Sequence, residues 1–253
     1  MRTLSIIGIG VGDPDHLTLQ AVAALQRVQV VFMIDKGAAT SDLVRLRRQV
    51  CERHLREGSY RIVEAQDPPR DRDAPAYASA VAEWHERRAE LYERLLADEL
   101  DEDGRGAILV WGDPSLYDGT LRIVERILAR GDLPLDVEVI PGITSVQALA
   151  ARHRIPLNRI GGAVHITTGR RLAQGLPDGA DDVVVMLDGE GAFATVPGDD
   201  FDIYWGAQLG TEDEILVSGS LREAAGEIAR VRAEARAARG WIMDTYLLRR
   251  TTG

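Results

Sequence analysis

Residues 4–14 read LSIIGIGVGDP, an apolar run that ends in three glycines separated by single residues and then in Asp-Pro. A continuous apolar run is typical of a strand that is buried on both faces of a parallel sheet. Glycine has no Cβ, so the turn after this strand can bring main chain close to a ligand. Many α/β proteins begin in this way, so the stretch predicts the fold class more firmly than a ligand.

Strand and helix patterns alternate over the first 140 or so residues. The predicted strands after the first are 28–34, 61–65, 107–111 and 135–140, and the predicted helices are 18–28, 41–56, 75–100 and 119–130. Alternation of this kind predicts a parallel sheet with helices on both faces. Three of the strands run into Gly/Pro turns, at 8–14, 112–114 and 141–142. Ligands of such sheets bind beyond the carboxyl ends of the strands, so these turns mark the expected site.

The second half of the chain has a different pattern. Its predicted strands are 164–168, 183–187, 202–208 and 215–217; a helix follows at 221–238, and 241–248 alternates like a strand that is half exposed to solvent. The short spacing between the strands near Ala207 and Val217 suggests a hairpin and therefore a mixed sheet. We therefore expect two α/β domains, residues 1–142 and 143–253.

Composition limits the class of protein. The net charge of −10 over 253 residues argues against non-specific binding of nucleic acid. Cys51 is the single cysteine, so neither a disulfide framework nor a thiolate metal site is expected, and we predict no metal. Glycines and prolines interrupt the first apolar run, and no run is long enough to cross a bilayer. These features favour a cytoplasmic enzyme without a membrane or nucleic-acid partner.

A dinucleotide site is one alternative for the first turn. Gly8, Gly10 and Gly12 resemble a Rossmann loop, and Asp35 ends the second strand where a ribose-binding acid is expected. The fingerprint requires a glycine at position 13, however, and the residue there is Asp13. A carboxylate repels phosphate, and Pro14 removes an amide donor. An NAD-dependent oxidoreductase is therefore disfavoured.

The three turns together are more specific than any one of them. The order GIGVGDP (8–14), GDPSLY (112–117) and PGITS (141–145) resembles the tetrapyrrole methylase family, enzymes of corrin and sirohaem synthesis that depend on S-adenosylmethionine. The resemblance covers nearly the whole chain. It implies two α/β domains with a cleft between them, a parallel N-terminal sheet and a mixed C-terminal sheet, a tetrapyrrole substrate, and a homodimer. S-adenosyl-L-homocysteine would be the product of the donor.

Within this family, segments 165–171 and 185–190 are most similar to a member that methylates precorrin-5 at C1 and releases acetate. Two alternatives stay open. The chain could be another precorrin or uroporphyrinogen C-methyltransferase. It could also be a tetrapyrrole-binding or nucleotide-binding protein without enzymatic activity.

The resemblance also implies which residues contact the methyl donor. Those of the N-terminal domain are Val11, Trp111, Gly112, Asp113 and Leu116; those of the C-terminal domain are Thr144, Ser145, Met186 and Ala207. The contact at Trp111 would be through main chain. Each side chain has a structural alternative: the polar ones could serve only as caps, and the methionine only as core.

A macrocycle that carries many carboxylates requires basic groups on an acidic protein, and arginine can bind a carboxylate through two hydrogen bonds. Arg170 and Arg171 are the candidates for this contact. Loss of acetate requires a general base, for which we favour Asp35, with Tyr117 donating a hydrogen bond to the carbonyl. Asp113, Glu190 and His165 are the alternative bases.

Overall fold

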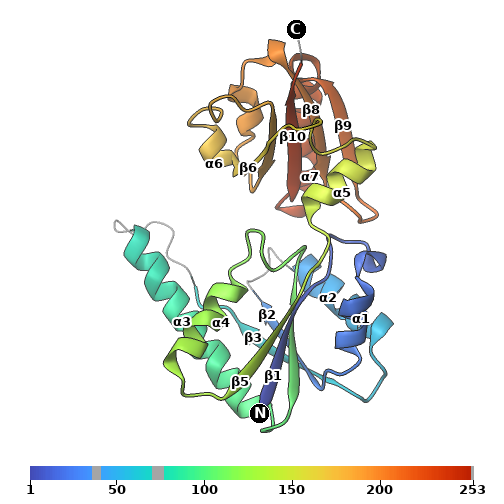
Figure 1. Cartoon of the computed structure of the whole chain (residues 1–253). Coiled ribbons are helices and arrows are strands. Elements are labelled where there is room, and N and C mark those ends of the chain that lie inside the picture. The colour runs from blue at the N-terminus through green and yellow to red at the C-terminus, as the bar shows by residue number, and fades with distance from the viewer. Residues whose placement is uncertain (36–40, 70–76, 252–253) are drawn as a thin grey trace. The chain divides into compact units, whose positions relative to one another are not determined.

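The computed structural model describes residues 1–35, 41–69 and 77–251 (Figure 1). The chain forms two compact units. Unit 1 comprises Met1–Gly10 and Pro14–Ile143, and unit 2 comprises Val11–Asp13 and Thr144–Gly253. Within the described ranges, no helix combines the length and the apolar composition needed to cross a membrane.

Unit 1 contains the predicted parallel sheet. Its strand order is β3-β2-β4-β1-β5, and every neighbouring pair is parallel. The strands are β1 (Arg2–Gly8), β2 (Val30–Asp35), β3 (Arg61–Gln66), β4 (Arg105–Val110) and β5 (Leu135–Ile140). This order places β1 between β4 and β5, which are the other two strands that end in glycine turns. The prediction of a parallel α/β fold is confirmed.

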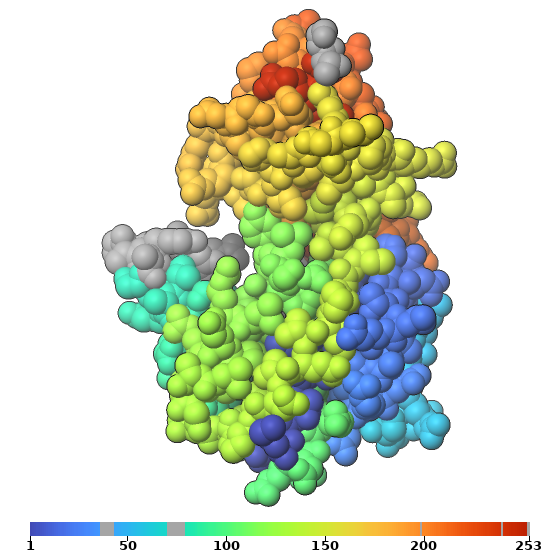
Figure 2. Space-filling model, in the orientation of Figure 1, coloured from blue at the N-terminus to red at the C-terminus, as the bar shows by residue number. Residues whose placement is uncertain are grey.

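Side chains of each strand alternate between the two faces of this sheet. On β1, Leu4 and Ile6 pack with α3 (Tyr77–Glu99) and α4 (Thr120–Arg130), whereas Ile7 packs with α1 (Leu19–Leu25) and α2 (Ser41–His54). Figure 1 shows these two pairs of helices on opposite sides of the strands. On the face seen in Figure 2, the yellow-green segment around β5 separates the green segment around α4 from the blue segment around α1. The sheet is therefore covered on both sides.

Helix α1 is shorter than predicted. Thr18 caps it, because Ala21 N donates to Thr18 Oγ1 at 3.0 Å, and it ends at Leu25 rather than at residue 28. The sequence pattern places Leu19, Val22, Ala23 and Leu25 on the apolar side, but Leu25 alone of these four is buried, and Leu19 is 88% exposed. Residues 21, 24 and 25 face the core instead, and Leu19 lies on the opposite side of a helix that turns 100° per residue.

Unit 2 contains the predicted mixed sheet, with strand order β6-β7-β10-β8-β9. Strands β6 and β7 are parallel, β10 is antiparallel to both β7 and β8, and β8 and β9 form the predicted hairpin. Helix α7 (Leu221–Arg239) covers one face and α5 (Ser145–His153) the other. The strands are β6 (Val164–Thr168), β7 (Asp182–Met186), β8 (Phe201–Ala207), β9 (Ile215–Ser220) and β10 (Asp244–Arg250).

The last strand is not half exposed, and that prediction was wrong. Strand β10 is central, and its residues 244–248 are all buried. Two of these residues are polar, which produced the alternating pattern. They are tolerated in the interior because they have hydrogen-bonding partners: Asp244 accepts from Arg232 and Trp205, and Thr245 donates to Ser145.

Candidate functional site

The three glycine turns of unit 1 meet at one edge of its sheet. Because β4, β1 and β5 are adjacent and parallel, their carboxyl ends lie together. Gly112 N donates to Gly10 O at 2.8 Å, and Gly10 N donates to Gly112 O at 3.3 Å. A Cβ added at Gly8 would lie 2.6 Å from Gly142 N and 2.7 Å from Gly112 O. Main chain packs directly on main chain at this edge, which no residue with a side chain permits.

The Asp113 carboxylate joins two of these turns. Its Oδ2 accepts from Gly142 N at 2.8 Å, and its Oδ1 accepts from Ser115 N at 2.8 Å and from Ser115 Oγ at 2.5 Å. Burial by itself would raise the pKa of this carboxyl, but the hydrogen bonds from Ser115 and Gly142 outweigh burial and lower the pKa. Asp113 is therefore ionised, and its hydrogen bonds hold the turn after β4 against the turn after β5.

The remaining candidates of unit 1 follow neighbouring strands. Trp111 and Leu116 are half-buried on the loop after β4, and Tyr117 is exposed on the same loop with a φ of +54°. Asp35 ends β2, the neighbour of β4, and its Oδ2 accepts from Gln66 Nε2 at 3.2 Å. Both proposed catalytic residues thus lie on the carboxyl side of the sheet, as expected for a ligand site.

Candidates of unit 2 lie at one edge of the second sheet. Strands β7 and β8 flank β10 and run in the same direction, so Met186 and Ala207 end side by side with one strand between them. Helix α5 starts at this edge, because Thr245 Oγ1, next to Met186 in the ladder, donates to Ser145 Oγ at 3.0 Å. Thr144 caps α5: its Oγ1 accepts from Gln147 N at 3.4 Å, and its own N donates to Gln147 Oε1 at 2.8 Å.

Comparison with known proteins identifies the family of the chain. The family model for Tetrapyrrole (Corrin/Porphyrin) Methylases matches residues 3–225. The chain belongs to this family. The resemblance carried by the three turns is confirmed, and the methylase has the two α/β units that the family implies.

Among the relatives of the methylase, the precorrin-6A synthase [deacetylating] of Sinorhizobium sp. is 52% identical over 250 residues, which cover 99% of this chain and 96% of that protein. A crystal structure of a putative cobalamin synthesis related protein from Corynebacterium diphtheriae is 43% identical, with a TM-score of 0.86 and 98% coverage of both chains. A uroporphyrin-III C-methyl transferase from Thermus thermophilus, crystallised with S-adenosyl homocysteine, shares the fold. Its TM-score is 0.57 at 19% identity, with 97% of this chain and 96% of that chain covered.

Sequence reasoning missed two residues at the edge of the unit 2 sheet where Met186 and Ala207 end. Gln208 follows Ala207 with a φ of +50°; it is 5% exposed, and its Nε2 has no hydrogen-bond partner among the described residues. Thr245 lies 100 positions from its partner Ser145. A polar residue directly after a strand was a usable signal for Gln208, whereas nothing local marks Thr245.

The other candidates lie where the strands of unit 2 place them. Arg170 and Arg171 are exposed on the short helix α6 (Gly169–Leu172), which follows β6 at the same edge as Met186. Arg171 Nη1 donates to Gln174 Oε1 at 3.4 Å. Val11 is buried within unit 2, and Glu190 is exposed after β7.

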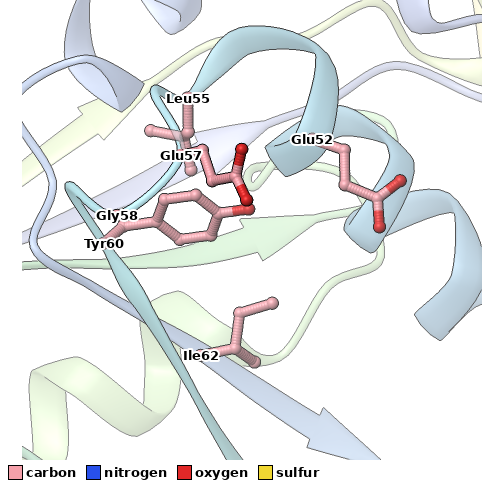
Figure 3. Close-up of a pocket in the computed structure, with 6 residues that line it drawn as sticks. All are labelled: Glu52, Leu55, Glu57, Gly58, Tyr60 and Ile62. Carbon is pink, nitrogen blue, oxygen red and sulfur yellow. The ribbon is translucent and has the colours of Figure 1, made fainter.

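A separate hollow of about 530 Å³ lies at the opposite end of unit 1's sheet (Figure 3). Tyr60 and Ile62 line it at the start of β3, together with residues at the end of α2, and burial raises the pKa of Tyr60. The charged residues of its lining are Glu52 and Glu57. Such a lining would repel a substrate rich in carboxylates, so the glycine turns are the better candidate site.

Proposed function

We propose that this methylase converts precorrin-5 to precorrin-6A, transferring a methyl group from S-adenosylmethionine to ring carbon C1 and releasing acetate. The observation that carries the proposal is the 52% identity, over 99% of the chain, to a relative named precorrin-6A synthase [deacetylating]. A lower similarity, 29% identity over 60% of the chain, links it to a probable cobalt-precorrin-2 C(20)-methyltransferase from Methanocaldococcus jannaschii. We further propose a cytoplasmic homodimer.

Two sets of residues are assigned to the donor, one in each unit. In unit 1, main chain of the turn at Trp111–Asp113 would bind it, with Leu116 beside the turn. This assignment fits because a Cβ added at Gly8 or at Gly142 would collide with main chain, including Gly112 O. A sulfonium nucleoside is a zwitterion with an apolar purine, so it needs amide groups and an apolar slot rather than a phosphate-binding loop.

In unit 2, the edge formed by Thr144, Ser145, Met186 and Ala207 would receive the apolar part of the donor, with Val11 nearby. The orphaned Gln208 Nε2 supports this assignment, because a buried amide donor without a partner costs free energy unless a ligand acceptor completes it. A ring nitrogen of the purine is an acceptor of the required kind.

When bound, S-adenosylmethionine supplies an electrophilic methyl group. The residues of the chain need only hold the ring carbon in line with it, since alignment at near contact supplies much of the rate of a displacement. Loss of acetate is a second step. Water adds to the acetyl carbon, the bond from that carbon to the ring breaks, the ring carbon keeps the electron pair and takes up a proton, and acetate leaves. Asp35 would accept the water's proton, with its carboxylate held by Gln66, and Tyr117 would donate a hydrogen bond to the carbonyl oxygen. Arg170 and Arg171 would bind carboxylates at the rim of the substrate.

The decisive experiment is an anaerobic incubation of the methylase with precorrin-5 and donor labelled in the methyl group. We expect label in the tetrapyrrole and an equal amount of free acetate. Label without acetate would indicate a methylase acting at another ring carbon, and binding without transfer would indicate a carrier. Calorimetry with S-adenosylhomocysteine and with NAD tests the donor separately, and heat with NAD alone would refute the assignment of the turns.

Replacing Asp113 by Ala should weaken the binding of S-adenosylhomocysteine by roughly tenfold to a hundredfold, because the main-chain N–H groups of Gly142 and Ser115 lose the acceptor that holds the turns, at about 1–3 kcal/mol. The affinity of Asp113→Asn should lie between those of wild type and Asp113→Ala, since Oδ1 can still accept from Ser115 while the new NH₂ faces Gly142 N.

The lowered pKa of Asp113 means that its carboxylate stabilises the fold above about pH 4, the unfolded pKa, and stops doing so as the pH falls through the folded value. The difference in stability between each variant and wild type should therefore be the same at all pH values near neutral. Wild-type affinity in Asp113→Ala would remove Asp113 from the site.

A further inference from the structure

The residue after Met186 has an unusual backbone. Leu187 has a φ of +53°, in the left-handed region, and it is 65% exposed. In this conformation the Cβ of any L-residue other than glycine is crowded by its own main chain. A leucine also gains nothing here from burial in the core. The fold therefore carries an unfavourable backbone and an exposed apolar side chain at the same position.

The backbone of Leu187 is held by the residue that follows it. Asp188 is buried, and its carboxylate accepts from Gly191 N at 2.8 Å, from Ala192 N at 2.7 Å and from Tyr246 Oη at 2.7 Å. Arg232 donates to the main-chain oxygen of Asp188. On the other side, Met186 is held in the ladder with β10. Leu187 is the single link between two anchored residues, and this accounts for its conformation.

Nothing in this anchoring requires a leucine. Glycine adopts a positive φ at no steric cost and would serve the turn better. The strained backbone and the exposed side chain together indicate that the side chain has a ligand. We propose that Leu187 packs against the apolar face of the tetrapyrrole ring and determines the affinity for the substrate. The proposal rests on the proposed function of the methylase.

Exposure and position favour the macrocycle over the donor as this ligand. Ala207 is fully buried and Met186 half-buried at the same edge, so they suit a small nucleoside. Leu187 lies further out. A corrin precursor has a wide apolar face and carboxylates at its rim, and the exposed Arg170 and Arg171 follow β6, the strand beside β7. One edge of unit 2 thus offers an apolar side chain for the ring face and cations for the rim.

The test is the substitution Leu187→Gly, which removes the side chain and relieves the backbone. We expect an unchanged or higher Tm, an unchanged Kd for S-adenosylhomocysteine, and a KM for precorrin-5 raised by roughly tenfold, the usual effect of losing an apolar contact. Leu187→Asn, which also tolerates the left-handed region, should behave in the same way, and Leu187→Met should stay near wild type. Arg154→Gly is the matched control, because Arg154 is also exposed and has a φ of +57°, at the far end of α5. The Tm of this variant should rise, and its KM for precorrin-5 should not change.

Two results would overturn the proposal. A raised Tm with an unchanged KM would show that Leu187 serves the turn alone, and a weaker Kd for S-adenosylhomocysteine with an unchanged KM would make it a donor contact. The proposed function can fail separately, if wild type does not turn over precorrin-5. In that event, quenching of tryptophan fluorescence by uroporphyrin III measures tetrapyrrole affinity directly, and Leu187→Gly should still weaken it by about tenfold, whereas equal affinities would refute the contact.

Discussion

Gly142→Ala is expected to lower the free energy of unfolding of unit 1 by at least about 3 kcal/mol, at the upper end of the usual cost of overpacking. The added Cβ would lie 2.1 Å from Gly112 O and 2.8 Å from Gly8 Cα. All of these neighbours are main chain, so no flexible side chain can move aside. The turns after β1, β4 and β5 would have to separate, and Asp113 would lose its bond from Gly142 N. Urea denaturation and calorimetry with S-adenosylhomocysteine measure the two effects, and we expect binding to be lost with the stability.

Gly226→Ala is the matched control for this change. Gly226 is exposed within α7, and no described atom outside that helix lies within 4 Å of a Cβ built on it. Alanine in a helix interior is favoured over glycine by about 0.5–1 kcal/mol, so this variant should gain stability and bind the donor product normally. The change from glycine to alanine should therefore lower the free energy of unfolding at position 142 and raise it at position 226. If Gly142→Ala retained both stability and binding, the close approach of the three turns would be wrong.

The edge of unit 1 was predictable because its signals are local. An apolar run followed by glycines and Asp-Pro identifies a buried parallel strand and its turn without reference to the rest of the chain. Three such turns predicted one ligand edge, and the order β4-β1-β5 brings them together. The strand order itself was not predicted, since it depends on which crossovers the helices make.

Unit 2 was less predictable because its polar residues are satisfied over long sequence distances. Asp244 and Thr245 made β10 look exposed, whereas their partners Trp205 and Ser145 lie 39 and 100 positions away. The turn at Leu187 depends in the same way on Tyr246 and Arg232. A local pattern cannot show whether a buried polar group will find a partner, so the anchored residues of the candidate site appear only in the folded chain.

Arg232→Met is expected to be the most damaging change in unit 2. Arg232 Nε donates to Asp244 Oδ2 at 2.7 Å, and the two side chains are 10% and 3% exposed. Burial raises the pKa of Asp244 even with the guanidinium beside it. Removing one partner of a buried ion pair leaves an uncompensated charge and costs about 3–5 kcal/mol. The variant also loses the bond to Asp188 O, so the turn that holds Leu187 should loosen and the KM for precorrin-5 should rise.

The pH dependence distinguishes a stranded charge from a lost packing contact. Without Arg232, Trp205 Nε1 is the one hydrogen-bond donor to the Asp244 carboxylate left among the described residues, so the folded pKa of Asp244 should rise further above its unfolded value. A raised folded pKa imposes its full penalty above that value and less as the pH falls below it toward the unfolded value of 3.8. When the variant is measured at neutral pH and at about pH 5, its loss of stability relative to wild type should therefore be smaller at the lower pH. Arg232→Met with Asp244→Asn should show no such recovery, because an amide does not titrate while its oxygen can still accept from Trp205. Arg230→Met, at an exposed pair with Glu234, should cost less than about 0.5 kcal/mol at either pH. A loss in Arg232→Met that is equally large at both pH values would mean that packing, rather than the charge of Asp244, makes Arg232 necessary beneath the Leu187 turn.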